Sequence, residues 1–295
     1  MRRPTSTRGG PARPASVGEK LGSEPWRVIR PGNRGALRRT PSELWDHREL
    51  GWTLILRDLQ LRFRQTLFGI GWVVLQPLTA MVAFSAIFGQ VADLPSDGLP
   101  YPVFVLAGVA AWIYLSAAVG GAADSLVNHS ELITKIRFPR LLAPIAAVLA
   151  AGVNLIVAIL LLAPVMAIYG IAPPLAALTL PLWLLFAVLI ATGAGFWLAA
   201  ANVLYRDVRY ALPFLLQIWL FISPVVFPTS LVGEPERYLF AINPAVGLID
   251  GLRWSLLGGP TPGAELAVSI AAALALLIGG LIYFLRVERS FADRI

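Results

Sequence analysis

The sequence contains no cysteine, only two histidines, and few charged residues of any kind, which make up 14% of its 295 residues. Without cysteine, neither a disulfide nor a thiolate metal site can form, and His47 and His129 are too few for a histidine-based metal site. A soluble domain carries about a quarter charged residues, whereas 57% of this chain is hydrophobic. These shortages argue against a soluble fold.

Long apolar runs are what the sequence has in abundance. A helix needs about 20 mostly apolar residues to cross a hydrocarbon core roughly 30 Å thick. None of the runs that pass this test contains Asp, Glu, Lys, Arg or His, which argues against an ion-coupled transporter because ionisable residues in spans usually mark ion pathways. The prediction is an all-α integral membrane protein with six spans, at residues 67–88, 101–120, 141–169, 175–204, 210–228 and 266–285.

Basic residues predict the orientation, since loops rich in Lys and Arg stay in the cytoplasm. With a cytoplasmic N-terminus, 22 of the 24 basic residues lie inside, and only Arg237 and Arg253 lie outside. Both termini are therefore predicted to be cytoplasmic and the protein to reside in the plasma (inner) membrane. Because the charge is scattered over short loops, anionic lipid head groups are the predicted partners rather than nucleic acid. The outer connections carry Asp93, Asp97, Glu234, Glu236, Asp250 and Glu265.

Three regions follow one another along the chain. Residues 1–40 lack apolar periodicity and are predicted to be a disordered, basic cytoplasmic tail. Residues 41–66 are predicted to form amphipathic interfacial helices, and residues 67–295 the six-span domain. Between 52 and 67 one helical face is apolar, with Leu54 and Leu61 as exceptions on the polar side. Such a helix lies in the head-group plane or packs on a soluble partner; its predicted head-group contacts are Arg57, Asp58, Arg62 and Arg64.

The longest outer connection, residues 229–263, separates the fifth span from the sixth. It predicts two short re-entrant helices, at 237–242 and 245–257, separated by the breaker Asn243-Pro244. Irregular backbone at membrane depth needs protein or water to cover it. These helices are therefore predicted to line or close a pathway on the outer side.

Four motifs occur in a fixed order relative to the six spans. They are Arg57-Asp58 and Arg62-Phe63 leading into Gly69-Ile70-Gly71-Trp72 and Gln76-Pro77; Leu132-Ile133-Thr134-Lys135-Ile136-Arg137-Phe138-Pro139-Arg140; Asn202-Val203-Leu204-Tyr205-Arg206-Asp207-Val208; and Phe291-Ala292-Asp293. With these motifs, residues 43–295 resemble the permease subunits of polysaccharide ABC exporters of type 2, which include O-antigen and teichoic acid exporters. The resemblance implies a homodimer, docked on two nucleotide-binding ATPase subunits, that moves a lipid-linked glycan outward.

The sequence agrees with ATP binding by a separate subunit. Neither lysine, Lys20 or Lys135, lies in a phosphate loop of the form G-x-x-x-x-G-K-[ST], so ATP and Mg are expected on the partner subunit and no cofactor on this chain. The chain is thus predicted to be a transporter subunit and not an enzyme. The alternatives are a drug or small-lipid exporter of the same superfamily, or a membrane glycosyltransferase, for which Asp93 and Asp97 are the acidic candidates.

The segment between the second and third spans is the predicted contact with the ATPase. Its helical stretch stops at Phe138-Pro139, and its cations could meet acidic groups or simply anchor the loop to lipid heads. Arg206 and Asp207 are predicted to form a structural ion pair between the fourth and fifth spans. The predicted coupling residues are Lys135, Arg137, Phe138, Pro139 and Arg140.

Aromatic and amide side chains within the spans are the candidates for a glycan conduit. A ring face stacks on the apolar face of a sugar, although Trp and Tyr also anchor helices at membrane interfaces. The fifth span also contains Pro213, Pro224 and Pro228, which favour kinks. The predicted conduit residues are Trp72, Gln76, Tyr101, Trp112, Tyr114, Gln217 and Trp219.

Overall fold

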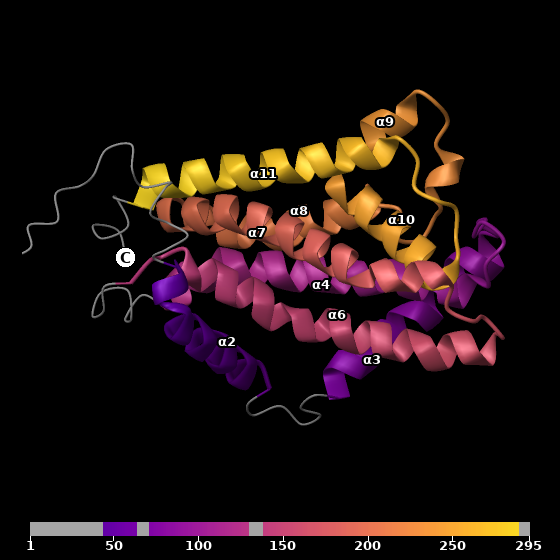
Figure 1. Cartoon of the computed structure of the whole chain (residues 1–295), viewed down its shortest axis with the longest axis horizontal. Helices are drawn as coiled ribbons and strands as arrows, with labels where there is room; N and C mark the ends of the chain where they lie inside the picture. The colour runs from indigo at the N-terminus through magenta and orange to yellow at the C-terminus, as the bar shows by residue number, and fades with distance from the viewer. Residues whose placement is uncertain (1–43, 64–70, 130–137, 289–295) are drawn as a thin grey trace, which may run out of the picture.

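The computed structural model of the chain describes residues 44–63, 71–129 and 138–288 (Figure 1). Within these ranges every regular element is a helix, which confirms the all-α prediction for this part of the chain. The predicted tail, residues 1–40, lies outside the described residues. The motif Phe291-Ala292-Asp293 lies outside them as well.

Five helical segments are long and apolar enough to cross a membrane, and they match five of the six predicted spans. Their apolar length alone makes them candidates for membrane spans. They are α3 (Gly71–Phe84) with its π-helical continuation η2 (Ser85–Val91), α4 (Tyr101–Asn128), α6 (Leu142–Ile168), the 3-10 turn η3 (Leu175–Thr179) with α7 (Leu180–Leu204), and α11 (Glu265–Val287).

The remaining predicted span, residues 210–228, is helical only within α8 (Asp207–Phe221). Fifteen residues of helix extend about 22 Å, less than the roughly 30 Å of the hydrocarbon core. The helix tolerates Pro213 but ends before Pro224, in keeping with the bias against helix just before a proline. Beyond it lie three short elements, η4 (Thr229–Leu231), α9 (Glu236–Phe240) and α10 (Pro244–Leu257).

Helix α4 is the centre of the bundle. In its most apolar stretch 78% of the residues are buried, against 11% for Gly71–Val91. Both α6 and α7 pack along it, and its many alanines and glycines let neighbouring backbones approach closely. The core therefore surrounds α4, whereas α3 lies at the periphery.

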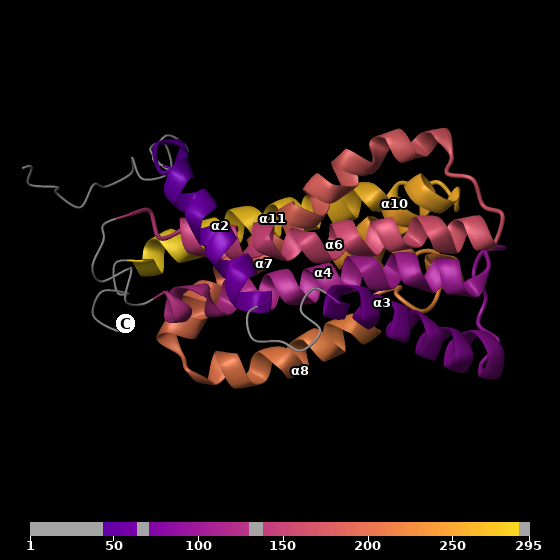
Figure 2. The same cartoon turned by 90° about the horizontal axis from the view of Figure 1, so that it is seen from below.

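The connections between the long helices gather at two ends of the bundle (Figures 1 and 2). The C-terminal ends of α4, α7 and α11 and the start of α6 lie at one end. The turns that precede α4 and follow α6 lie at the other, together with α9 and α10. This partition agrees with the predicted division of charge. We call the first the basic end (Arg140, Arg206, Arg209 and Arg286) and the second the acidic end (Asp93, Asp97, Glu236 and Glu265).

Helix α2 (Arg48–Phe63) makes up most of the described part of the predicted interfacial region, and it runs obliquely to the bundle at the basic end (Figure 2). Leu54 is only 2% exposed and packs against Leu142 and Ala146 of α6. The prediction that Leu54 lies on the polar side was therefore wrong. The reason is that α2 has two apolar surfaces: one packs on the bundle, and the other, with Trp52 and Leu56, remains exposed.

Candidate functional site

The chain between α8 and η4, residues 222–228, is irregular, so several of its backbone carbonyls lack the backbone partners that a helix would provide. Side chains from α4, α10 and the residue that caps α10 take their place. Because unpaired polar groups are costly away from water, these bonds hold the irregular segment against the bundle. The bonds are Tyr101 Oη to Val226 O (2.6 Å), Arg253 Nη2 to Val225 O (2.8 Å) and Asn243 Nδ2 to Ile222 O (3.0 Å).

Arg253 on α10 is the centre of this arrangement, with a side chain only 4% exposed. Its Nε donates to the carbonyl of Phe104 (3.3 Å), and its guanidinium carbon lies 3.5 Å from the centroid of the Phe104 ring. Asp250 Oδ1 lies 4.0 Å from Nη1. A buried charge is tolerated only when it is paired and hydrogen-bonded, and in this site carbonyls, a ring face and a carboxylate share that role.

Sequence reasoning placed Arg253 in an outer connection but missed its burial. A signal was present, because an arginine within an otherwise apolar helical stretch, 245–257, usually has a specific partner. The helix itself was predicted correctly: Asn243 is its N-cap, accepting from the backbone N–H of Ala245 (3.1 Å), and Gly258 at φ 70° closes its C-terminus. Whether α10 is re-entrant stays a prediction.

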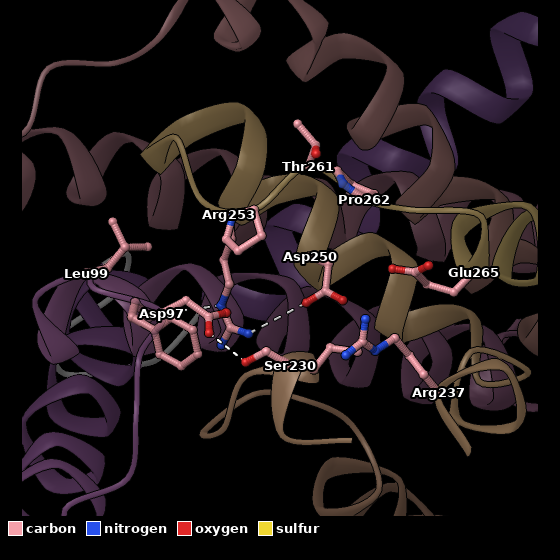
Figure 3. Close-up of a pocket in the computed structure, with 12 residues that line it drawn as sticks. Asp97, Leu99, Ser230, Arg237, Asp250, Arg253, Thr261, Pro262 and Glu265 are labelled. Atoms are coloured by element: carbon pink, nitrogen blue, oxygen red, sulfur yellow. Dashed lines mark hydrogen bonds and ion pairs between the residues drawn. The ribbon is translucent and has the colours of Figure 1, made fainter. Parts of the chain in front are cut away.

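A polar pocket of about 110 Å³ opens beside Arg253 at the acidic end (Figure 3). Asp250 points toward Arg253, and Asp97 accepts a hydrogen bond from Ser230 (2.6 Å). Arg253 Nη1 is buried without a hydrogen-bond partner in the described chain. The volume suits a few waters, at about 30 Å³ each, and is well below the roughly 300–1,000 Å³ of sites for larger ligands.

The described residues contain no group of three or more His, Asp or Glu side chains placed to hold a metal ion. In the pocket, Arg237 and Arg253 contribute cations among the carboxylates. The pocket can therefore bind water or hydroxyl groups by hydrogen bonds.

Four of the predicted conduit residues lie in or near this region. Trp112 and Trp219 are half-buried and meet edge to face, with centroids 5.7 Å apart, and Trp219 Nε1 donates to Asn243 Oδ1 (2.8 Å). Tyr101 uses its hydroxyl on the irregular segment. Tyr114 is 0% exposed inside the core, so within this chain it offers no surface to a substrate.

The other three, Trp72, Gln76 and Gln217, are exposed side chains of α3 and α8. These two helices bury little of their own surface, with Pro77 the buried residue of α3 and Leu212 that of α8. Their apolar side chains therefore face whatever surrounds a single chain, either lipid or a second protein surface.

At the basic end, Asp124 near the end of α4 is the acceptor that joins three helices. It pairs with Arg209 of α8 (3.5 Å) and accepts from Asn202 Nδ2 of α7 (3.1 Å). Arg206 and Asp207 lie at the start of α8, where the acidic side chain suits the helix N-terminus. Their mutual ion pair stays a prediction.

The predicted coupling segment is described only from Phe138 onward; Lys135 and Arg137 lie outside the described residues. Phe138 is half-buried against the cluster formed by Leu54 and Leu142, and Arg140 Nη1 donates to the carbonyl of Glu288. The segment is thus attached both to α2 and to the end of α11. Pro139 begins the turn into α6, and its contact with a partner stays a prediction.

Among the predicted head-group contacts of α2, Arg57 is exposed and Asp58 is half-buried. Asp58 Oδ1 lies 3.2 Å from Nε2 of His129, which follows α4, and His129 Nδ1 donates to the carbonyl of Ser125 (2.7 Å). This pair links the oblique helix to the bundle. The side chain of Arg62 and all of Arg64 lie outside the described residues.

We expect this link to weaken as the pH rises. The contact with Asp58 raises the pKa of His129 above its usual 6.5, although burial and the charge of Arg57 oppose the effect. A raised folded-state pKa means that the stabilisation is complete below about pH 6.5 and is lost as the pH rises through the folded value. Thermal unfolding of the purified protein between pH 5.5 and 9 measures this loss. It should be smaller in Asp58→Asn, and identical pH profiles would contradict the assignment.

The described fold is that of a multi-pass helical membrane protein. A family model described as ABC-2 type transporter matches residues 49–257, more than half of the chain, and the chain belongs to this family. It is accordingly a multi-pass protein of the plasma membrane.

Three relatives illustrate the similarity. The O-antigen export system permease protein RfbA of Myxococcus xanthus is 28% identical over 81% of this chain and 92% of its own length. A protein of the same name from Klebsiella pneumoniae is 21% identical over 80% and 91%, respectively. The polysialic acid transport protein KpsM of Escherichia coli is 24% identical over 70% of this chain and 80% of its own.

Proposed function

We propose that this chain is the membrane-spanning subunit of an ABC exporter that moves a lipid-linked polysaccharide from the cytoplasmic side outward across the plasma membrane. The observation that carries the proposal is similarity to permeases named for O-antigen export over most of both chains. The lack of a phosphate-binding loop in the sequence supports a separate ATPase subunit that holds ATP and Mg.

The proposed topology has six spans, with the basic end in the cytoplasm. The fifth of these spans combines α8 with the irregular segment 222–228. The carbonyls of Ile222, Val225 and Val226 in this segment are paired with side chains, as a membrane-embedded segment requires. The helices α9 and α10 then re-enter from the outer side. The charge of the connections supports this orientation, because the basic end holds the arginines of the short loops.

We also propose a homodimer whose conduit runs beside α3 and α8. These helices bury the least surface within one chain and carry Trp72, Gln76 and Gln217. A neutral polymer needs ring faces and hydrogen-bonding groups that do not depend on a particular sugar sequence, and these three side chains offer both.

Depletion of this chain should abolish surface polysaccharide and accumulate lipid-linked glycan on the cytoplasmic side. The native chain should restore export. The double variant Phe138→Ala/Arg137→Glu should not, because it alters the segment predicted to contact the ATPase, and export should fall about tenfold or more, as loss of about 1.4 kcal/mol of coupling would give. Surface glycan, normalised to membrane-inserted protein, is the measurement.

The matched control is Arg286→Glu, a charge reversal at the same basic end but on α11. It should export normally and should co-purify with the ATPase subunit. Unchanged surface glycan on depletion would overturn the polysaccharide proposal and favour a drug or small-lipid substrate. Normal ATPase binding by the double variant would overturn only the docking assignment.

A further inference from the structure

A cavity of about 580 Å³ lies between α2, α4 and α6 at the basic end, and it is several times larger than the polar pocket beside Arg253. Its inner wall consists of small residues, among them Ala117 and Gly121 of α4 and Ala147 and Ala151 of α6. These side chains leave a smooth apolar surface because none extends beyond a methyl group. Ser125 and Asn128 of α4 add a hydroxyl and an amide to the lining.

The mouth of the same cavity is polar and charged. Arg57 and Asp58 of α2 line it, together with His129 beyond the end of α4. The guanidinium of Arg57 is exposed. His129 is buried, and its Nε2 makes no hydrogen bond of good geometry within the described chain, having only the ion-pair contact with Asp58.

The cavity thus complements an anionic lipid: its interior is apolar, like an acyl chain, and the arginine at its mouth can pair with an anionic head group. The carboxylate of Asp58 is engaged by His129, which leaves Arg57 as the charge available to a ligand. A guanidinium prefers phosphate and carboxylate, and phosphate is the anion found at the head-group level where an interfacial helix lies. Leu61 of α2, 55% exposed, adds apolar surface to the lining.

We propose that this cavity is a binding site for an anionic glycerophospholipid, with one acyl chain against the alanine and glycine wall and the phosphate on Arg57. The volume falls in the range of ligand sites, roughly 300–1,000 Å³. An acyl chain suits the alanine and glycine wall because removing apolar surface from water is favourable. The site contains none of the predicted conduit residues, and the proposal does not depend on which substrate is exported.

The bound lipid would fill the space between α2 and the bundle and so help to set the position of α2. Leu54 and the Asp58–His129 pair attach α2 on one side of the cavity, and the lipid fills the space beside them. The position of α2, and with it that of Phe138 packed on Leu54, then depends on membrane composition.

The test compares two neighbouring glycines on α4. An added Cβ at Gly121 has only an ordinary contact with Ala147 (3.7 Å), and a longer side chain there enters the cavity. At Gly120 an added Cβ meets nothing within 4 Å, and this residue does not line the cavity. Gly121→Leu should therefore displace the lipid, whereas Gly120→Leu changes the same helix by the same side chain without filling the site.

The full-length protein, in detergent with phosphatidylglycerol added, is analysed by native mass spectrometry. One phosphatidylglycerol should be retained by the native chain and by Gly120→Leu, and at least about fivefold less by Gly121→Leu. Arg57→Gln should also lower retention, whereas Arg286→Gln, at an exposed arginine of the same end, should not. Sodium phosphate at millimolar concentration should not compete, because it lacks the acyl chain.

Equal retention by Gly121→Leu and Gly120→Leu, with both variants folded by thermal unfolding, would overturn the site. Equal retention by Arg57→Gln and the native chain would overturn the assignment of the phosphate contact. Displacement of phosphatidylglycerol by equimolar polyprenyl phosphate would overturn the choice of a glycerophospholipid, and displacement by inorganic phosphate would show a simple anion site. None of these outcomes would contradict the export proposal, because that proposal is tested separately by measuring surface glycan.

Discussion

Replacing Arg253 with leucine is expected to lower the free energy of unfolding by about 3–5 kcal/mol, the usual cost of breaking a buried ion pair by removing one partner. The variant removes the side-chain donor to the carbonyls of Phe104 and Val225 and leaves Asp250 without its countercharge. The irregular segment after α8 would lose its central attachment. Thermal or denaturant unfolding of the purified protein in one detergent measures the effect, and surface glycan reports the consequence for export.

Two further variants show whether geometry or charge matters at this position. Arg253→Lys keeps the charge, but its single nitrogen cannot take the positions of both Nε and Nη2 or lie flat on the Phe104 ring, so it should recover only part of the loss. Arg237→Leu, a cation of the same pocket that donates to Val232 nearby, should change stability by less than about 1 kcal/mol. A stable, export-competent Arg253→Leu would show that the arginine does not hold the segment.

Gly280→Val is expected to destabilise the protein by about 3 kcal/mol, at the upper end for overpacking, because it separates α7 from α11. A Cβ at Gly280 would lie 2.6 Å from the carbonyl oxygen of Gly193, and a Cβ at Gly193 would lie 2.8 Å from the backbone nitrogen of Leu277. The obstructing atoms are backbone in both cases, so no side chain can rotate out of the way. Unfolding under the same conditions as for Arg253→Leu measures the change.

Gly152→Ala on α6 is the matched control. An added Cβ there meets nothing within 4 Å, and alanine favours helix over glycine by about 0.5–1 kcal/mol, so this variant should be neutral or slightly more stable. If Gly280→Val were equally stable, the close approach of α7 and α11 would not contribute to the fold.

Hydropathy predicted most of the helices well because membrane depth sets one requirement that every span must meet on its own. The residues 141–169 became α6 within one residue at each end, and 175–204 became η3 and α7 with the same limits. Hydropathy did not indicate that the helix within the predicted span 210–228 ends at Phe221, because the apolar composition continues past that residue. Apolar composition indicates that a segment lies in an apolar environment. Prolines and tertiary contacts decide where its helix ends.

In the candidate site, too, local sequence predicted the helix but not its tertiary contacts. The helix at 245–257 and the breaker Asn243-Pro244 before it followed from local sequence signals, whereas the role of Asn243 as N-cap came from the structure. The contact of Arg253 with Phe104, 149 positions away, did not, because no local pattern encodes which distant carbonyl an arginine will reach. Tyr114 illustrates the opposite case: an aromatic residue that suits a conduit by type is fully buried by its neighbours.

The sequence by itself determined that this is a helical membrane protein, which of its connections share an end of the bundle, and which transporter motifs it carries. Each of these depends on composition or on residues close together in the chain, where hydrophobicity and charge act locally. Only the tertiary structure decided that Arg253 is buried, that Leu54 faces the bundle, and that a cavity remains between α2, α4 and α6. These features arise from the packing of helices distant in sequence, where side-chain size and the pairing of polar groups select one arrangement among many that share the same hydropathy.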